Sequence, residues 1–368
     1  MKLAAAGRLV AGNIAVLIGL ILVLLFLFSL VGDGYNFAKS LFPKNDKRAE
    51  LPTYQDHDYA RLIFHEQKDS IKNYVPFSEW RQTAQQRATL NIDEEGHRMH
   101  TVGLDNLPTA NTLGFFGAST VWGTGVDDNG TIPAYFDQST DEYNVINYSE
   151  RGYTSMQNLI DLMTLINQQK APKVVIFYGL LNDVWVHCNA SITNRMNSHL
   201  EERRIQNALD RTTEANYLYN NLLAPITSFI FKFIGSKKGQ EIAACSNDPR
   251  RADQVAEMMV KNLEIANTLV TSYGGEFHAF LQPSAYLRNP KVDYLDLPQD
   301  SFAFQKREMQ TIMPQFLNKM TAASYDWFTD LSATFDNQDF LLIDHVHSSA
   351  LGNSLIANRI KDRLQSKQ

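Results

Sequence analysis

The first apolar segment of the chain, residues 9–31, is almost continuous and is interrupted by Asn13. At about 1.5 Å per residue, a helix of roughly 23 residues reaches about 35 Å, which is enough to cross a hydrocarbon core of about 30 Å. A cleaved signal peptide would have a shorter apolar core and a small-residue cleavage site, and neither is evident here. We therefore predict a transmembrane helix within residues 1–31.

Basic residues flank this segment on both sides: Lys2 and Arg8 precede it, and it is followed by Lys39, Lys44, Lys47 and Arg48. The positive-inside rule therefore mildly opposes an orientation with the N-terminus inside. The tail before the helix is nevertheless very short and the rest of the chain follows it, as in a signal anchor. We expect a single-pass membrane protein whose larger part is exported, either periplasmic or extracellular.

The pattern beyond the helix changes at residue 106. Residues 32–105 are polar and charged, which suggests a juxtamembrane linker and an accessory segment that packs on a domain edge. In residues 106–368, apolar runs of strand length alternate with stretches of helical period. The expected strands are 113–117, 144–148, 173–179, 277–281 and 326–331; the expected helices are 132–138, 155–168, 253–272, 302–320 and 349–364. This alternation predicts an α/β domain with a parallel sheet and crossover helices on both faces.

A polar and helical stretch at about 186–250 interrupts this alternation. It falls between a strand and its crossover helix, so we interpret it as an insertion that could act as a lid. Cys188 and Cys245, the two cysteines of the chain, flank this stretch. They either form a disulfide that closes the insertion in an oxidising compartment or are two unrelated buried thiols. With so few thiols and no paired spacing, a zinc site is not expected.

The composition is that of a globular protein with a sizeable core: 44% of the 368 residues are hydrophobic and 20% are charged. The formal net charge of -6 at pH 7 makes the chain slightly acidic. Binding of nucleic acid depends on clustered basic residues, so nucleic acid is not an expected partner.

A candidate nucleophile stands at the end of the first predicted strand, where Gly117-Ala118-Ser119 follows an apolar run. Gly123 and Gly125 permit a sharp turn beyond it. The serine is therefore expected at the carboxyl edge of the sheet, where ligands of open α/β sheets bind. Small residues after a buried strand often make only a tight turn, so this stretch does not decide the matter alone.

Further candidate residues are expected at the same edge. Gly152 follows the second strand, Asn182 and Asp183 follow the third, and Asp344-x-x-His347 precedes the last helix. Acyl transfer needs a hydroxyl nucleophile, a general base oriented by a carboxylate, and donors aimed at the developing oxyanion. Each feature has a simpler explanation as a turn or a helix cap, but all of them in this order favour one catalytic site.

Over roughly residues 110–365 the chain resembles the SGNH hydrolase family, also called GDSL esterases and lipases. The resemblance rests on four short motifs: Gly117-Ala118-Ser119, Gly152, Gly179-x-x-Asn182-Asp183 and Asp344-x-x-His347. The resemblance implies a three-layer α/β/α sandwich with a flavodoxin-like parallel sheet, and neither a metal nor an organic cofactor. It implies that Ser119 attacks an ester carbonyl, that His347 takes its proton, and that Asp344 orients the imidazole. The oxyanion hole would consist of the backbone N–H groups of Ser119 and Gly152 and the side-chain amide of Asn182.

Two features of the chain stand out when it is compared with the family that it resembles. Ala118 stands where the family usually has an aspartate, which is not one of the four residues that give the family its name. Residues 115–123, Phe-Phe-Gly-Ala-Ser-Thr-Val-Trp-Gly, follow the predicted membrane anchor. In this they resemble the branch found with bacterial envelope and exopolysaccharide systems.

Together, the predicted anchor and the resemblance indicate an exported, membrane-anchored serine esterase or O-acyltransferase. Its expected substrate is an acyl ester of a cell-envelope glycan, with acetyl as the expected acyl group. The expected partners are the membrane, through the N-terminal helix, and envelope-polysaccharide machinery. Hydrolysis and transfer share the same residues and stay alternatives. Two further alternatives are a lipid or lysophospholipid esterase, and a catalytically silent glycan-binding or assembly protein with the same fold.

Overall fold

The computed structural model describes residues 46–100, 111–190, 195–197 and 244–366, and the single positions 13, 16, 17 and 20. The chain divides into two compact units, and the described residues from 46 onward belong to the unit formed by residues 46–207 and 239–368. Apart from those four positions, the predicted transmembrane helix lies outside the described residues, as does most of the predicted insertion at 186–250. Among the helices that are described, none is both long enough and apolar enough to cross a bilayer.

A five-stranded sheet in the order β6-β5-β7-β8-β9 forms the centre of this unit, and every neighbouring pair is parallel. The strands are β5 (Thr112–Gly117), β6 (Asn144–Asn147), β7 (Val174–Gly179), β8 (Glu276–Leu281) and β9 (Phe328–Asp330). This is the flavodoxin-like order, in which the first strand lies inside the sheet. Because all strands run the same way, their carboxyl ends meet at one edge, where Gly117 pairs with Tyr178 and Gly179 with Leu281.

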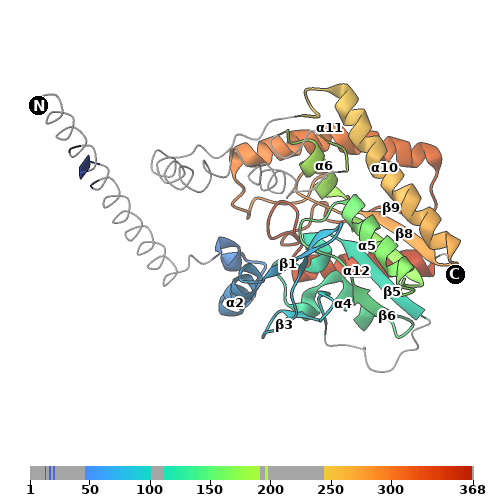
Figure 1. The fold of residues 1–368 in the computed structure, drawn as a ribbon, viewed down its shortest axis with the longest axis horizontal. Coiled ribbons are helices and arrows are strands. Elements are labelled where there is room, and N and C mark those ends of the chain that lie inside the picture. The colour runs from blue at the N-terminus through green and yellow to red at the C-terminus, as the bar shows by residue number, and fades with distance from the viewer. Residues whose placement is uncertain are drawn as a thin grey trace, which may run out of the picture. The chain divides into compact units, whose positions relative to one another are not determined.

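Helices cover both faces of the sheet and complete three layers (Figure 1). They are α4 (Ile132–Gln138), α5 (Ser155–Asn167), α10 (Pro249–Ser272), α11 (Gln299–Ala323) and α12 (Ala350–Gln365). One apolar core joins α5, α10 and α11 to Phe116 and Phe177, and the other joins α4 and α12 to Phe115 and Ile176. The two cores alternate along each strand because successive side chains point to opposite faces. The predicted α/β fold with a parallel sheet is confirmed.

The ends of some elements differ from the prediction. The last strand, predicted at 326–331, covers Phe328–Asp330, because the residues before it form the turn that leaves α11. Helix α11 is longer than the predicted 302–320, although Pro314 lies inside it. Two short helices, α3 (Ser119–Trp122) and α6 (Leu181–His187), were not predicted, because segments of this length show no helical period.

Residues 46–100 pack on the loops that leave the carboxyl edge. Their elements are η1 (Lys47–Glu50), α2 (His57–Lys68), and two antiparallel pairs, β1 (Lys72–Val75) with β2 (Glu79–Gln82) and β3 (Gln85–Gln86) with β4 (Asn91–Ile92). The buried Gln67 amide donates to the carbonyl oxygens of Gly123 (3.0 Å) and Val126 (2.8 Å) and accepts from the backbone N–H of Gly125 (2.8 Å). The accessory segment thus fixes the loop that follows Ser119, a role that the sequence left open.

Arg98 strengthens this attachment from inside the protein. Its fully buried guanidinium donates to the carbonyl oxygens of Trp122 (2.9 Å) and Val126 (2.8 Å) and pairs with Asp128 (2.9 Å). It also lies over the Trp122 ring at 4.7 Å. A buried cation is tolerated only when its donors are satisfied, so this loop and Arg98 depend on each other.

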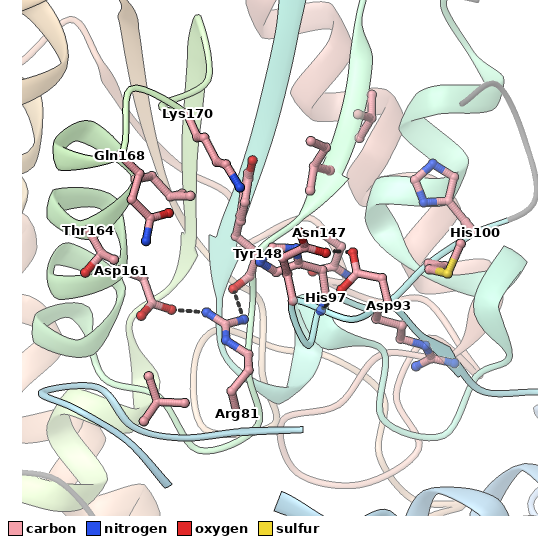
Figure 2. A pocket seen from close by; sticks show the side chains of 17 residues that line it. Arg81, Asp93, His97, His100, Asn147, Tyr148, Asp161, Thr164, Gln168 and Lys170 are labelled. Carbon is pink, nitrogen blue, oxygen red and sulfur yellow. Dashed lines mark hydrogen bonds and ion pairs between the residues drawn. The ribbon is translucent and has the colours of Figure 1, made fainter. Parts of the chain in front are cut away.

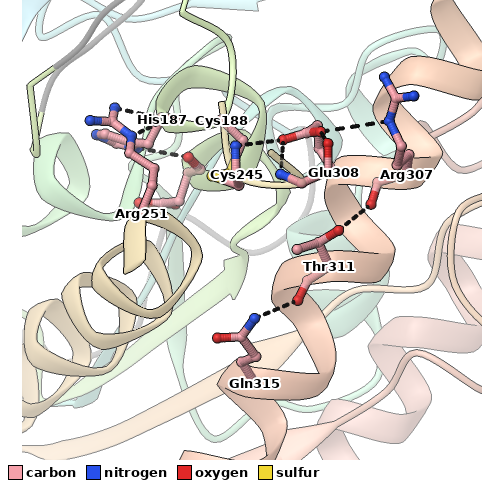
Figure 3. Close-up of a disulfide and its surroundings, with 10 residues drawn as sticks. His187, Cys188, Cys245, Arg251, Arg307, Glu308, Thr311 and Gln315 are labelled. Carbon is pink, nitrogen blue, oxygen red and sulfur yellow. Dashed lines mark hydrogen bonds and ion pairs between the residues drawn. A yellow bond between two sulfur atoms is a disulfide. The ribbon is translucent and has the colours of Figure 1, made fainter. Parts of the chain in front are cut away.

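Cys188, at the C-terminal end of α6, and Cys245, which precedes α10, form a disulfide (Figure 3). The alternative of two unrelated thiols is thereby excluded. Glu308 on α11 accepts hydrogen bonds from the backbone N–H groups of Cys245 (2.9 Å) and Ser246 (3.1 Å). The two sulfurs and the Glu308 carboxylate lie together, but sulfurs bonded to each other are not the thiolates that a zinc site requires.

Candidate active site

Ser119 stands at the first position of α3, immediately beyond β5. The approach to it requires a glycine at 117, since a Cβ there would lie 2.6 Å from the carbonyl oxygen of Tyr178 and 2.6 Å from Cγ2 of Val121. Helix α3 then ends at Gly123, whose φ of 97° lies in the left-handed region. The chain therefore turns sharply at the carboxyl edge of the sheet and presents the serine there.

The structure brings Ser119, His347 and Asp344 together, although 228 positions separate the serine from the histidine. The distance between His347 Nε2 and Ser119 Oγ is 2.7 Å. The distance between His347 Nδ1 and Asp344 Oδ2 is also 2.7 Å. Because a carboxylate can only accept, Nδ1 carries the proton and Nε2 is left to accept the hydrogen bond from the serine hydroxyl. This is the tautomer that a general base needs.

A tight loop holds the acid and the base in this geometry. Asp344 Oδ1 accepts from the backbone N–H groups of Val346 and His347, each at 2.9 Å. The carbonyl oxygen of Val346 accepts from the side-chain amide of Gln282, with Nε2 at 3.0 Å. The Asp-x-x-His spacing thus lets one carboxylate cap its own loop and bind the imidazole at the same time.

Arg48 of the accessory segment is a third partner of Asp344, with Nη1 donating to Oδ2 at 2.7 Å. Burial alone would raise the pKa of the Asp344 carboxyl, but the neighbouring His347 and Arg48 hold that pKa well below its ordinary value. Sequence reasoning counted Arg48 only among the basic residues that flank the membrane segment. Nothing in the local sequence distinguishes it, because its partner lies 296 positions away.

The three donors predicted for an oxyanion hole lie beyond the ends of β5, β6 and β7. Among the described residues, the backbone N–H groups of Ser119 and Gly152 have no acceptor. Gly152 has a φ of 89°, so the loop after β6 needs a residue without a side chain there. Asn182, in the first turn of α6, donates from Nδ2 to the carbonyl oxygen of Tyr153 at 3.0 Å. An amide nitrogen carries a second hydrogen, which this bond leaves available.

Asp183 connects the loop of Asn182 to the loop of Gly152. Its carboxylate accepts from Ser155 Oγ (2.6 Å) and from the backbone N–H of Ser155 (3.0 Å), at the start of α5. Burial raises the pKa of Asp183 to about 6. Asp183 therefore binds the N-terminus of α5 rather than that of its own helix. In this way it fixes the loop of Asn182 relative to the loop of Gly152.

Ala118 replaces the aspartate usual in the family and forms no side-chain hydrogen bond as the N-cap of α3. The serine hydroxyl still lies within hydrogen-bond distance of His347. Thr120 Oγ1 donates to the carbonyl oxygen of Val346 at 3.4 Å and so joins α3 to the histidine loop. The family aspartate is thus not required for the serine and histidine to meet.

A cavity of about 450 Å3 lies away from this site, between the accessory segment, β6 and α5 (Figure 2). None of the predicted site residues lines it. Figure 2 shows Arg81 inside it, donating to the carbonyl oxygen of Tyr148 (2.8 Å) and paired with Asp161. His97 and Asp93 also line the cavity, and Nδ1 of the imidazole lies 3.3 Å from Oδ2 of the carboxylate. These side chains satisfy one another, so we interpret the cavity as part of the junction between the accessory segment and the sheet.

The fold and the arrangement of Ser119, His347 and Asp344 define the class of serine hydrolases and acyltransferases. The model of the GDSL-like lipase/acylhydrolase family matches residues 113–360, and the chain belongs to this family. The match begins in β5 and ends within α12. It therefore contains every predicted site residue but leaves the accessory segment, with Arg48, outside.

Several solved structures are similar to the chain. A GDSL-like lipase from Bacteroides thetaiotaomicron VPI-5482 is 12% identical, with 72% of this chain and 92% of that chain covered and a TM-score of 0.38. A member of the lipolytic G-D-S-L family from Veillonella parvula DSM 2008 is 13% identical, with coverage of 69% and 97% and a TM-score of 0.37. The C-terminal catalytic domain of peptidoglycan O-acetyltransferase A from Streptococcus pneumoniae is 12% identical, with coverage of 70% and 94% and a TM-score of 0.31. Similarity this low transfers no substrate. No curated protein matches the chain.

Proposed function

We propose that the protein is an exported, membrane-anchored serine esterase or O-acyltransferase that acts on acyl esters of a cell-envelope glycan, with acetyl as the acyl group. The observation that supports the catalytic part is the relay from Ser119 Oγ through His347 to Asp344, with both contacts at 2.7 Å. A silent protein with this fold would have no need to keep a serine hydroxyl on the free nitrogen of a correctly oriented imidazole.

In the first half-reaction, Ser119 Oγ attacks the carbonyl carbon of the ester while its proton passes to His347 Nε2. The imidazolium that forms is stabilised by Asp344 on its other nitrogen. The carbonyl oxygen becomes an oxyanion, and the backbone N–H groups of Ser119 and Gly152 and the Asn182 amide donate to it. Collapse of this intermediate breaks the bond to the alcohol, which leaves with the proton of His347 and yields an acyl-serine.

In the second half-reaction, His347 removes a proton from the incoming hydroxyl, whose oxygen attacks the acyl-serine. The bond to Ser119 Oγ breaks, and the serine recovers its proton from the imidazolium. When the incoming hydroxyl belongs to water, the result is hydrolysis. When it belongs to a sugar, the acyl group is transferred to the glycan.

Two features support the exported part of the proposal. The Cys188–Cys245 disulfide is of the kind that persists in oxidising compartments. The apolar run at residues 9–31 has the length of a membrane anchor. The glycan substrate and the acetyl group rest on the resemblance of residues 115–123 to the envelope and exopolysaccharide branch of the family.

The experiment that tests the catalytic part is covalent labelling of the purified full-length chain with a fluorophosphonate. We expect the wild type to label, and the variants Ser119→Ala and His347→Ala to lose labelling while keeping the circular dichroism of the wild type. Labelling that survives either substitution, or a folded wild type that does not label, would reject the proposal.

Hydrolysis and transfer are separated by the fate of the acetyl group. The chain is incubated with 4-nitrophenyl acetate alone and then with added envelope oligosaccharides. Mass spectrometry of the oligosaccharides detects an increase of one acetyl group per transfer. An acyltransferase should release 4-nitrophenol faster when the acceptor is present, whereas an esterase should release acetate at an unchanged rate.

A further inference from the structure

Arg48 lies between two carboxylates, one from its own segment and one from the candidate triad. Its Nε and Nη2 donate to Asp46 Oδ1 (3.0 Å) and Oδ2 (2.8 Å), and its Nη1 donates to Asp344 Oδ2 (2.7 Å). The guanidinium also lies over the ring of Phe64 at 4.6 Å. All three nitrogens are thus engaged, and the planar group cannot turn away from Asp344 without losing several contacts.

The arginine binds the same carboxylate oxygen that the imidazole uses. Asp344 Oδ2 receives both Arg48 Nη1 and His347 Nδ1, while Oδ1 receives the two backbone N–H groups of its loop. The positively charged guanidinium bound to that oxygen offsets part of the carboxylate's negative charge, and this negative charge is what stabilises the imidazolium. Asp46, on the far side of the guanidinium, in turn offsets part of the positive charge.

We infer that Arg48 is a positioning residue for the reaction proposed above, and that the chain of contacts Asp46–Arg48–Asp344 sets the basicity of His347. Arg48 holds the Asp344 carboxylate in the orientation that receives His347 Nδ1, and its positive charge opposes the second positive charge that forms on the imidazole during the reaction. Asp46 limits this effect. The inference rests on the proposed function, because it concerns the base of that reaction.

Two other titratable groups, His345 and Tyr54, lie near this chain of contacts, and neither is mutated in the test. The ring of His345 lies against Tyr286, with centroids 5.4 Å apart, and burial lowers the pKa of its imidazole. Tyr54 is bound through its hydroxyl to the carbonyl oxygen of Gly125 at 2.7 Å, and burial raises the pKa of that hydroxyl. Both are therefore neutral near pH 7. The variants therefore differ from the wild type only in the charge at position 46 or position 48.

The test is the second-order rate constant for fluorophosphonate labelling of the full-length chain, measured from pH 5 to pH 9. Arg48→Gln removes a positive charge and so favours the imidazolium. The midpoint of the acid limb of the pH–rate profile should therefore shift to higher pH by about one unit. Asp46→Asn removes the negative charge that offsets the charge of Arg48 and so disfavours the imidazolium. The midpoint of the acid limb should therefore shift to lower pH by about half a unit. Arg48→Lys keeps a charge and should lie between wild type and Arg48→Gln.

Lys47→Gln is the matched control, since it removes a charge from the same short helix. Lys47 pairs with Asp296 at the surface, where their side chains are 87% and 80% exposed, and its profile should coincide with that of the wild type. Shifts in opposite directions support the inference, and the Asp46→Asn shift alone supports it if Arg48→Gln fails to fold. If the acid limbs of both variants coincide with that of the wild type and only their stability is reduced, the inference is overturned and the proposed function stands. A wild type that does not label would overturn both.

Discussion

At the scale of single residues, Asp344 is the group on which the charge of the site depends, because its two oxygens serve different partners. One oxygen fixes the histidine loop through backbone N–H groups, and the other receives the imidazole and Arg48. Burial acts to raise the pKa of this carboxyl, but the neighbouring His347 and Arg48 hold that pKa well below its ordinary value. The carboxylate is therefore ionised at any pH at which His347 can act as a base.

We expect Asp344→Asn to lower the rate of fluorophosphonate labelling by about 10³–10⁴-fold. An amide can hold the imidazole in the wrong tautomer and cannot stabilise the imidazolium. Asp339→Asn is the control, because Asp339 only pairs with Lys291 at 2.8 Å on the surface, and it should label within about twofold of the wild type. A loss below tenfold in Asp344→Asn would contradict the assigned role.

Asn182→Ala tests the side-chain donor of the oxyanion hole. Its kcat for 4-nitrophenyl acetate should fall by about 10²–10³-fold, with KM changed little, because the lost hydrogen bond forms to the oxyanion and not to the bound ester. Asn318→Ala makes the same change at an exposed position of α11 and should match the wild type. A rise in KM with an unchanged kcat would instead assign Asn182 to substrate binding.

At the scale of elements, the loop between α3 and α4 is shaped by side chains from the accessory segment. Gln67 on α2 makes three hydrogen bonds to its backbone, and Arg98 makes others from inside the core. Backbone groups of a loop that is buried need such partners, because each unpaired group costs free energy. The family region therefore relies on elements outside it.

Gln67→Ala should lower the free energy of unfolding by about 2–3 kcal/mol, since it leaves buried backbone groups of the loop unpaired. Chemical denaturation followed by tryptophan fluorescence measures the change. The neighbouring exposed Lys68, mutated to alanine, should change the same quantity by less than about 0.5 kcal/mol. Equal effects of the two substitutions would show that the loop holds its own conformation.

The disulfide acts between elements as well, because it ties the end of α6 to the entry of α10. The cysteines are 57 positions apart, and closing a loop of this length is expected to contribute about 4 kcal/mol through the entropy of the unfolded chain. We expect the double variant Cys188→Ser, Cys245→Ser to lose about 2–4 kcal/mol of unfolding free energy, and reductant to have the same effect on the wild type. A double variant as stable as the oxidised wild type would contradict this.

At the scale of the whole molecule, the accessory segment and the α/β domain form one structural unit. Leu90, Ile92 and Trp122 make an apolar cluster that joins them, and Arg48 of the accessory segment binds Asp344 of the candidate triad. A chain cut at the boundary predicted from sequence would expose this cluster and lose Arg48. The boundary at residue 106 thus separates two sequence patterns rather than two independent structures.

A chain of residues 106–368 should accordingly unfold at a lower temperature than one of residues 46–368, and its fluorophosphonate labelling should fall more than tenfold. Thermal unfolding and labelling of the two chains, purified side by side, measure the difference. The longer chain serves as the control, because it lacks only residues 1–45. Equal labelling and stability of the two chains would show that the accessory segment is dispensable.

The sequence by itself determined what depends on local pattern. Alternating apolar runs predicted the parallel sheet and its covering helices, because burial on both faces leaves a continuous apolar strand. Parallel strands bring their carboxyl ends together, so the residues after β5, β6 and β7 could be placed at one edge. The short spacing of Asp344 and His347 likewise marked an acid and a base that one loop can hold.

Only the tertiary structure decided which distant side chains complete the site. Arg48, Gln67 and Arg98 lie in a segment without strong periodicity, and their partners are far along the chain. A hydrogen bond between such positions depends on the packing of whole elements and leaves no pattern in either neighbourhood of the sequence. The same holds for the pairing of Cys188 with Cys245, which sequence could offer only as one of two alternatives until the fold brought the two sulfurs together.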